Sequence, residues 1–346
     1  VIGNISGKED RTITVWIGSG RDQANVLKAL ADERVTYEKG ISVNVMLVDM
    51  GTLLQATLAG EGPDVALGVG GEIPMNFGLR NAAVDLSQFE DLDELRDDFI
   101  NGAWVPYEYE GQVFGLPETL SFPMMFYRKD ILEQLNLKVP KNWDEFIEVA
   151  TVIQRNNMQI YVPYTQITTT TTVNTGLGGL NLFATLLMQN NVPIYKESQD
   201  ACNLDSLEAI KVFEFWTDLY KDYKYLKQAD FYNRFRVGSM PLGIATYSTY
   251  LTLEAAAPEI QGKWAMAPVP GVEERSTAVA GSGTGCSIIK KSHNKKNAWE
   301  FLKWWTSADT QLRYSNQVEA MLGLVGRQLF PVAHLTSGSA ESIFIT

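Results

Sequence analysis

The chain has 346 residues, of which 45% are hydrophobic and 20% charged, and it carries 41 acidic against 29 basic side chains. This length exceeds what a single hydrophobic core organises and predicts two domains or lobes. The net charge of −12 argues against nucleic acid or an anionic membrane surface as the main partner, because both require a basic footprint.

No apolar run approaches the roughly 18 residues of a membrane span, and we expect any signal peptide to be already absent.

The N-terminal part of the chain predicts alternating strands and helices. Ile13, Val15 and Ile17 alternate along a strand, and residues 21–37 follow with helical spacing of apolar side chains. A strand at 41–47, a helix at 52–60 and an apolar strand at 62–70 complete a βαβαβ unit, which predicts a parallel sheet covered by helices.

The second half of the chain is expected to be rich in helices. Asn142 with Glu145, and Asp205 with Glu208, have the spacing of helix capping boxes. Residues 240–246 and 264–270 read as short strands. Two apolar stripes at helical spacing are predicted to face the core: Leu207, Ile210, Phe213 and Trp216 in the first, and Ala298, Phe301, Leu302 and Trp305 in the second.

Catalytic motifs are missing from the sequence. The chain has two histidines, His293 and His334, without the neighbours of a catalytic triad, and it has no nucleophile elbow, P-loop or G-x-G-x-x-G. The GSGTG at 281–285 follows no convincing strand and is weak as a nucleotide signal. Carboxylate pairs such as Glu108 and Glu110 leave a glycosidase as an alternative. We therefore expect a binding protein without catalytic residues, cofactor or metal.

Cys202 and Cys286 lie far apart and lack metal-ligand spacing. The simplest interpretation is two buried thiols.

Four segments, in order, resemble the extracellular solute-binding proteins of bacterial ABC importers, in the group of maltose-binding-like sugar receptors. They are GEGPDVALGVGGEIPMNFGLRNAAVDLSQF, YEGQVFGLPETLSFPMMFYRKDILEQLNLKVPKNWDEFIEVA, FRVGSMPLGIATYSTYLTLEAAAPEIQGKWAMAPVPG and SIIKKSHNKKNAWEFLKWWTSADTQ. Together they cover most of residues 11–312.

This resemblance implies an α/β, two-lobed periplasmic-binding-protein fold of type II, with hinge strands and a ligand cleft. Lobe 1 would comprise residues 11–117 and 268–312, and lobe 2 residues 118–267 and 313–346. Pro117 and Pro270 restrict the backbone at the expected crossings. The end of the chain, from residue 325, does not resemble the family's closing helices, which predicts a truncated or reorganised second lobe. Cys202 would fall in lobe 2 and Cys286 in lobe 1, without a disulfide between them.

Positions that match the family's motifs supply the candidate ligand-binding residues. They are Trp16, Ser19, Arg21, Glu72, Glu118, Thr119, Ser121, Phe122, Asn174, Tyr247, Tyr250, Ser282 and Thr284. An aromatic wall with a few convergent polar groups suits a sugar. Asn174 lies in the Thr- and Gly-rich stretch 166–181, which reads either as a polar rim at a helix N-terminus or as a mobile surface loop.

The expected function is that of an extracellular receptor that closes two lobes over a mono- or oligosaccharide and delivers it to a membrane permease. The resemblance also implies a monomer that is periplasmic or tethered to the cell surface as a lipoprotein. Two alternatives stay open. One is a receptor for a peptide or organic acid, with Arg21 as a carboxylate partner, and the other is a ligand sensor for a signalling protein.

Overall fold

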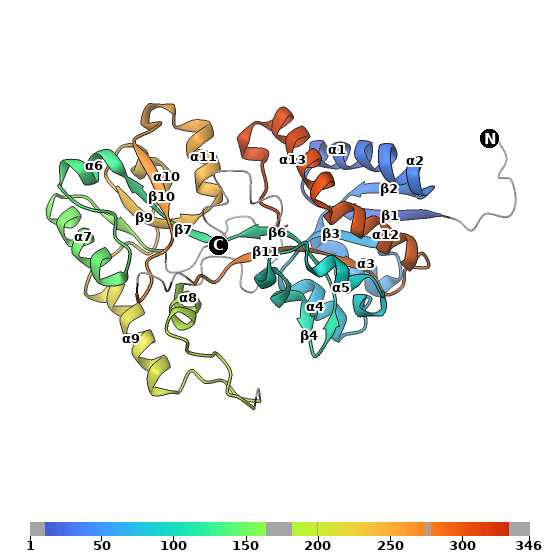
Figure 1. The fold of residues 1–346 in the computed structure, drawn as a ribbon, viewed down its shortest axis with the longest axis horizontal. Helices are drawn as coiled ribbons and strands as arrows, with labels where there is room; N and C mark the ends of the chain where they lie inside the picture. Colours follow the sequence, from blue (N-terminus) through green and yellow to red (C-terminus); the bar gives the residue numbers. More distant parts are fainter. Residues whose placement is uncertain (1–10, 164–181, 199, 274–275, 277, 332–346) are drawn as a thin grey trace, which may run out of the picture. The chain divides into compact units, whose positions relative to one another are not determined.

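The computed structural model describes residues 11–163, 182–198, 200–273, 276 and 278–331 (Figure 1). These residues divide into two compact units. Unit 1 contains residues up to 120 and from 283 onward, and unit 2 contains the described residues between 121 and 282. The Thr- and Gly-rich stretch 166–181, with Asn174, lies outside the described residues, so both interpretations of it stay predictions.

Unit 1 contains most of the predicted N-terminal elements and two helices from the end of the chain. Its strands are β1 (Thr12–Ile17), β2 (Ser42–Leu47), β3 (Val65–Gly70), β4 (Glu108–Tyr109), β5 (Gln112–Val113), β6 (Leu116–Ser121) and β11 (Ser282–Ile288), of which β6 and β11 reach the unit boundary. Its α-helices are α1 (Arg21–Ala31), α2 (Tyr37–Lys39), α3 (Leu53–Ala59), α4 (Glu72–Leu79), α5 (Leu92–Arg96), α12 (Lys295–Thr306) and α13 (Ala308–Leu322). A π-helical turn (Asp32–Thr36) joins α1 to α2, and 3₁₀ turns lie at Met50–Thr52, Leu86–Gln88, Asn101–Tyr107 and Leu324–Gly326.

The main sheet of unit 1 has the order β2-β1-β3-β11-β6, and β1 pairs in parallel with both β2 and β3. This confirms the predicted βαβαβ start. Alternate side chains of β1 serve the two faces: Ile13, Val15 and Ile17 join the core beneath α1, α12 and α13, whereas Trp16 joins a second cluster against α3 and α4. Both faces are therefore covered by helices, as a parallel sheet requires (Figure 1).

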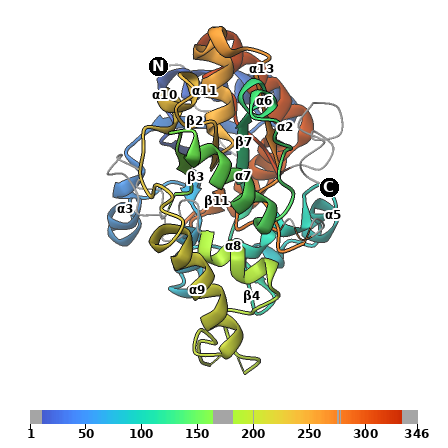
Figure 2. The same cartoon turned by 90° about the vertical axis from the view of Figure 1, so that its left-hand side faces the viewer.

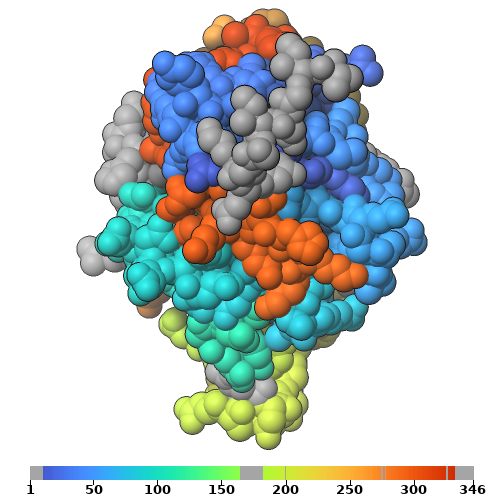
Figure 3. All heavy atoms as spheres, turned by 90° about the vertical axis from the view of Figure 1, so that its right-hand side faces the viewer, coloured from blue at the N-terminus to red at the C-terminus, as the bar shows by residue number. Residues whose placement is uncertain are grey.

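Helix α13 corrects the expected domain assignment. Residues 313–346 were expected in the second lobe, but Tyr314 and Val318 pack in the core of unit 1. Residues 268–282 belong to unit 2 instead of lobe 1, because the returning crossing lies at β11 and not near Pro270. Figure 3 shows the surface of α12 between the N-terminal elements and the segment around α4 and α5.

The second predicted apolar stripe, on α12, is confirmed. Ala298, Phe301, Leu302 and Trp305 are all buried in the unit 1 core. Within the glycine-rich GSGTG at 281–285, residues 282–285 belong to strand β11.

Unit 2 is built around a four-stranded sheet with the order β10-β7-β9-β8. Its strands are β7 (Pro123–Arg128), β8 (Ile160–Tyr161), β9 (Leu242–Thr246) and β10 (Trp264–Ala267). Its helices are α6 (Lys129–Gln134), α7 (Trp143–Arg155), α8 (Leu182–Gln189), α9 (Leu207–Lys221), α10 (Phe231–Arg236) and α11 (Ser248–Ala256), with a 3₁₀ turn at Pro258–Ile260. The two short strands predicted from residues 240–246 and 264–270 are confirmed as β9 and β10.

The strands of unit 2 also divide their side chains between two faces. Met125 of β7 joins the core formed with α7, α8 and α9, whereas Phe126 contacts Phe231 and Phe235 of α10. Figure 2 shows α7 beside β7, with α8 and α9 below. At the start of α7, the Asn142 side chain accepts a hydrogen bond from the Glu145 amide at 2.9 Å, which confirms the predicted cap.

Helix α9 corrects two expectations. Its N-cap is Ser206, whose hydroxyl accepts from the Ala209 amide, and not Asp205. The predicted core stripe is wrong as well, because Leu207, Ile210 and Phe213 are 62%, 43% and 48% exposed. The helix is apolar on two faces, and the face with Ala209, Val212, Leu219 and Tyr220 is the one that unit 2 buries.

The expectation of two buried thiols holds for one cysteine. Cys286 is buried in β11, but Cys202 is exposed in unit 2, and both are free.

Candidate functional site

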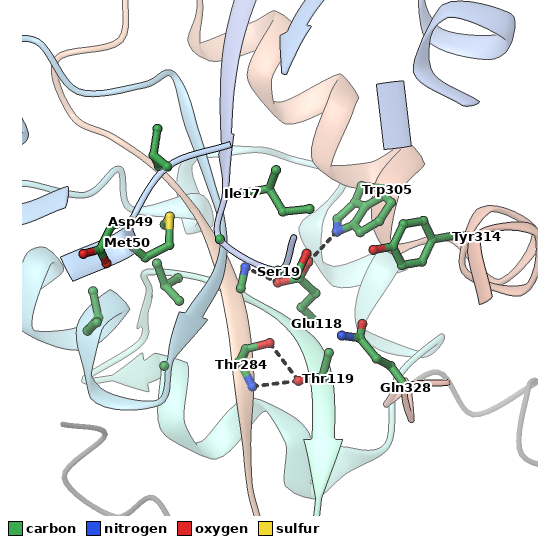
Figure 4. Close-up of a pocket in the computed structure, with 16 residues that line it drawn as sticks. Ile17, Ser19, Asp49, Met50, Glu118, Thr119, Thr284, Trp305, Tyr314 and Gln328 are labelled. Atoms are coloured by element: carbon green, nitrogen blue, oxygen red, sulfur yellow. Dashed lines mark hydrogen bonds between the residues drawn. The ribbon is translucent and has the colours of Figure 1, made fainter. Parts of the chain in front are cut away.

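A cavity of about 540 Å³ opens in unit 1 where the parallel strands end (Figure 4). Residues that follow β1 and β2, and the last residues of β3, line it together with parts of β6, β11, α12 and α13. Ligands of open α/β sheets bind in the crevice outside the carboxyl ends of the strands. The position and size of this cavity are therefore those of a small-molecule site.

A backbone irregularity in β3 supplies one polar group of the cavity. The register between β3 and β11 shifts near Gly285, and Gly68 adopts φ +65°, a conformation that favours glycine. Its amide leaves the ladder and donates to the Glu118 Oε2 atom at 2.5 Å.

Glu118 is the most strongly perturbed carboxyl group at the site. It lies on β6, is only 6% exposed, and accepts a second hydrogen bond from the Trp305 indole nitrogen at 2.9 Å. Burial raises the pKa of Glu118 to about 7, against the opposing effect of the Gly68 and Trp305 hydrogen bonds. A buried carboxyl group that titrates near neutrality inside a cavity is typical of a functional site.

Two threonines on adjacent strands form a hydroxyl pair below this carboxyl group. The Oγ1 atoms of Thr119 and Thr284 are 2.7 Å apart, and the Thr284 amide donates to the Thr119 Oγ1 at 3.1 Å. Figure 4 shows the pair below Glu118, with the Gln328 amide beside Thr119. The group combines donors and acceptors, as a polyhydroxylated ligand requires.

Aromatic and apolar side chains complete the wall. Trp305 and Tyr314 meet edge to face, with ring centroids 4.9 Å apart, and both are buried. Burial raises the pKa of the Tyr314 phenol, the charge of Glu118 raises it further, and a hydrogen bond with Ser19 lowers it. Asp49 and Met50 lie on the opposite side of the cavity (Figure 4), and the Asp49 side chain caps a 3₁₀ turn by accepting from the Gly51 amide.

The structure brings four predicted residues of unit 1 together: Ser19, Glu118, Thr119 and Thr284 line the cavity. It does not bring the other three there. Trp16 is 8% exposed in the core on the α3–α4 face, Arg21 is exposed at the first position of α1, and Glu72 begins α4.

The remaining described candidates belong to unit 2. Phe122, Tyr247 and Tyr250 form a continuous aromatic cluster, with centroids 6.0 Å apart for the first pair and 5.3 Å for the second. Ser121 and Ser282 lie at the two chain crossings. The binding role of these residues stays a prediction.

Sequence reasoning missed several residues that line the cavity. They are Asp49, Met50, Tyr314 and Gln328, and also Trp305, which was expected only as core. Asp49 could have been found from topology, because it follows the second parallel strand as Ser19 follows the first. Tyr314 and Gln328 carried no such signal, because their segment was expected in the other lobe.

The described residues offer no constellation for metal chemistry, since they contain no group of three or more His, Cys, Asp or Glu that could hold an ion. Glu108, which the glycosidase alternative requires, is ion-paired with Arg96 and lies outside the cavity.

Among the helices of the described residues, none combines the length and the apolar character that crossing a membrane requires.

A sequence comparison finds relatives that bind oligosaccharides. The chain is 24% identical over 267 residues to an arabinooligosaccharide-binding protein of Halalkalibacterium halodurans. The aligned residues cover 73% of this chain and 56% of that protein. The chain thus spans little more than half the length of this relative.

Solved structures show the same fold. The sugar-binding protein MalE of Xanthomonas citri superposes with a TM-score of 0.75 and 20% identity, covering 96% of this chain and 82% of that one. The cyclic α-maltosyl-1,6-maltose binding protein of Arthrobacter globiformis gives a TM-score of 0.75 and 18% identity, with 96% and 83% covered. These likenesses confirm the two-lobed solute-binding fold that the sequence motifs predicted.

The match to a family model shows the family to which the chain belongs. Residues 18–312 match the model described as bacterial extracellular solute-binding protein. The chain belongs to this family of bacterial extracellular solute-binding proteins.

Proposed function

We propose that this protein captures a mono- or oligosaccharide outside the cell and delivers it to the permease of an ABC importer. The observation that carries the proposal is the cavity of unit 1, whose lining includes Asp49, Glu118, Gln328 and the hydroxyl pair of Thr119 and Thr284. Carboxylates and amides hydrogen-bond sugar hydroxyls, and an apolar wall packs against the sugar ring. The relatives named for binding oligosaccharides support the same ligand class.

The charge of the cavity favours a neutral ligand over an organic acid. Of the described residues that line it, two are carboxylates and none is Lys, Arg or His. Arg21, which the organic-acid alternative requires as a partner, does not line it. A carboxylate ligand would face Asp49 and Glu118 without a compensating cation.

A ligand screen with matched variants tests the proposal. Calorimetric titrations would compare arabino-oligosaccharides, maltodextrins and monosaccharides with amino acids and dicarboxylic acids. Asp49→Asn keeps the acceptor for the Gly51 amide but removes the charge, so we expect sugar affinity to fall about tenfold with little loss of stability.

Asp85→Asn is the matched control, because Asp85 caps a 3₁₀ turn in the same way outside the cavity. Sugar binding that is insensitive to Asp49→Asn, or dicarboxylate binding in place of sugar binding, would refute the site. Recovery of chemically unchanged sugar after long incubation tests the absence of catalysis.

The transport role has its own test. Loss of uptake of the bound sugar in a deletion strain, restored by the wild-type gene, supports delivery to a permease, and unchanged uptake would favour the sensor alternative. Closure over the ligand, tethering as a lipoprotein and a monomeric state stay predictions. Small-angle scattering with and without sugar, membrane fractionation and light scattering check them.

A further inference from the structure

A second cavity, of about 360 Å³, lies in unit 2, and none of the described residues discussed for sugar binding lines it. The start of α7, the end of α8 and the first half of α9 enclose it. Its volume is at the lower end of the range for small-molecule sites, which run from about 300 to 1,000 Å³.

The floor of this cavity is apolar and held in place. Trp143, Leu186 and Val212 are buried core residues, and Phe215 packs against them half-buried. The rings of Trp143 and Phe215 meet edge to face at 5.8 Å, and the Trp143 indole nitrogen donates to Gln189 at 2.9 Å. The aromatic wall is therefore preorganised for an apolar group.

The rim carries three charged side chains that form no ion pair with another described residue. Asp144 is the second residue of α7, Glu208 is the second residue of α9, and Lys211 follows Glu208 by three positions. All three are exposed, and the described part of the chain offers none of them an ion pair or a side-chain hydrogen bond. Elsewhere on α9, by contrast, Lys221 pairs with Asp218.

We propose that this cavity binds an amphipathic zwitterion, namely an α-amino acid with a large apolar side chain. Asp144 and Glu208 bind the ammonium group, Lys211 binds the carboxylate, and the side chain packs on Trp143 and Phe215. A purely anionic ligand would face two carboxylates, and a purely cationic ligand would face the lysine and the positive ends of two helices. Only a ligand that carries both charges can pair with Asp144, Glu208 and Lys211 together.

Three probes that differ only in charge test this assignment. Titrations of L-phenylalanine, 2-phenylethylamine and 3-phenylpropionate would be followed by methyl NMR of protein labelled at Leu and Val. We expect phenylalanine to shift the Leu186 and Val212 signals and to bind about tenfold more tightly than either singly charged probe.

Charge-removing variants separate the two halves of the rim. Lys211→Met should weaken phenylalanine and 3-phenylpropionate about tenfold and should not weaken 2-phenylethylamine. Glu208→Gln should weaken phenylalanine and 2-phenylethylamine about tenfold and should not weaken 3-phenylpropionate. Lys221→Met and Glu214→Gln are the matched controls, because both residues lie on α9 outside the cavity.

A blocking variant keeps the test decisive. Val272→Trp fills the mouth from a position that is half-exposed, so it should abolish phenylalanine binding without unfolding unit 2. The proposal is overturned if phenylalanine shifts no signal of this cavity at millimolar concentration, or if either singly charged probe binds as tightly. Shifts confined to Val48, which lines the unit 1 cavity, would overturn it too.

Discussion

Replacing Glu118 by Gln should remove a large part of the pH dependence of stability. The pKa of this carboxyl group is about 7 in the folded protein, because burial disfavours its charged form, against an ordinary value of 4.5. The raised pKa contributes stability that is fully present below pH 4.5 and is lost as the pH rises through 7. Each pH unit between the two values is worth about 1.4 kcal/mol, so about 3 kcal/mol disappears between pH 4.5 and pH 8.

Urea denaturation of the wild type and of Glu118→Gln at several pH values between 4.5 and 8 measures this loss. Glutamine cannot ionise, so the free energy of unfolding of the variant should fall by about 3 kcal/mol less than that of the wild type over this range. Glutamine also has one acceptor oxygen for the Gly68 and Trp305 donors, so the variant should be less stable than the wild type at low pH.

Glu94→Gln, an exposed carboxyl group of the same unit, is the control and should keep the wild-type pH profile. An unchanged profile in Glu118→Gln would refute the account of a buried, titrating carboxyl group. Infrared difference spectra of the carboxyl stretch provide a readout that does not depend on unfolding.

Three further predictions concern single positions. Gly68→Ala should lower the free energy of unfolding by about 1–2 kcal/mol, because Gly68 has a positive φ. Gly71 has equal space for a Cβ but φ −34°, so Gly71→Ala should not have this effect. Equal effects of the two substitutions in urea denaturation would contradict the backbone argument. Gln189→Leu removes a buried side chain that makes three hydrogen bonds in unit 2, so we expect a loss of about 2–4 kcal/mol in the same assay; a neutral effect would show that these bonds matter little. A thiol reagent should modify Cys202 in the folded protein and Cys286 only in denaturant, because burial raises the pKa of the Cys286 thiol; two reactive thiols without denaturant would contradict this.

Local patterns were reliable guides to the elements of both units. Alternation at Ile13, Val15 and Ile17 and the stripe around Trp305 each reflect one buried face, so their periodicity identifies both the element and its core side. The stripe from Leu207 to Phe213 misled because α9 is apolar on two faces, and periodicity alone does not show which of them a neighbouring element covers.

By itself, the sequence determined the family, the alternating start of unit 1 and four residues of the cavity, because ordered motifs and strand periodicity are properties of contiguous residues. The tertiary structure decided the rest of the site. Tyr314 and Gln328 join Ser19 from some 300 positions away because α13 packs on unit 1, and Trp16 faces the core because its neighbours on β1 take the other side of the sheet. Where an element is apolar on two faces, as α9 is, packing partners distant along the chain determine which face is buried, and local periodicity does not predict it.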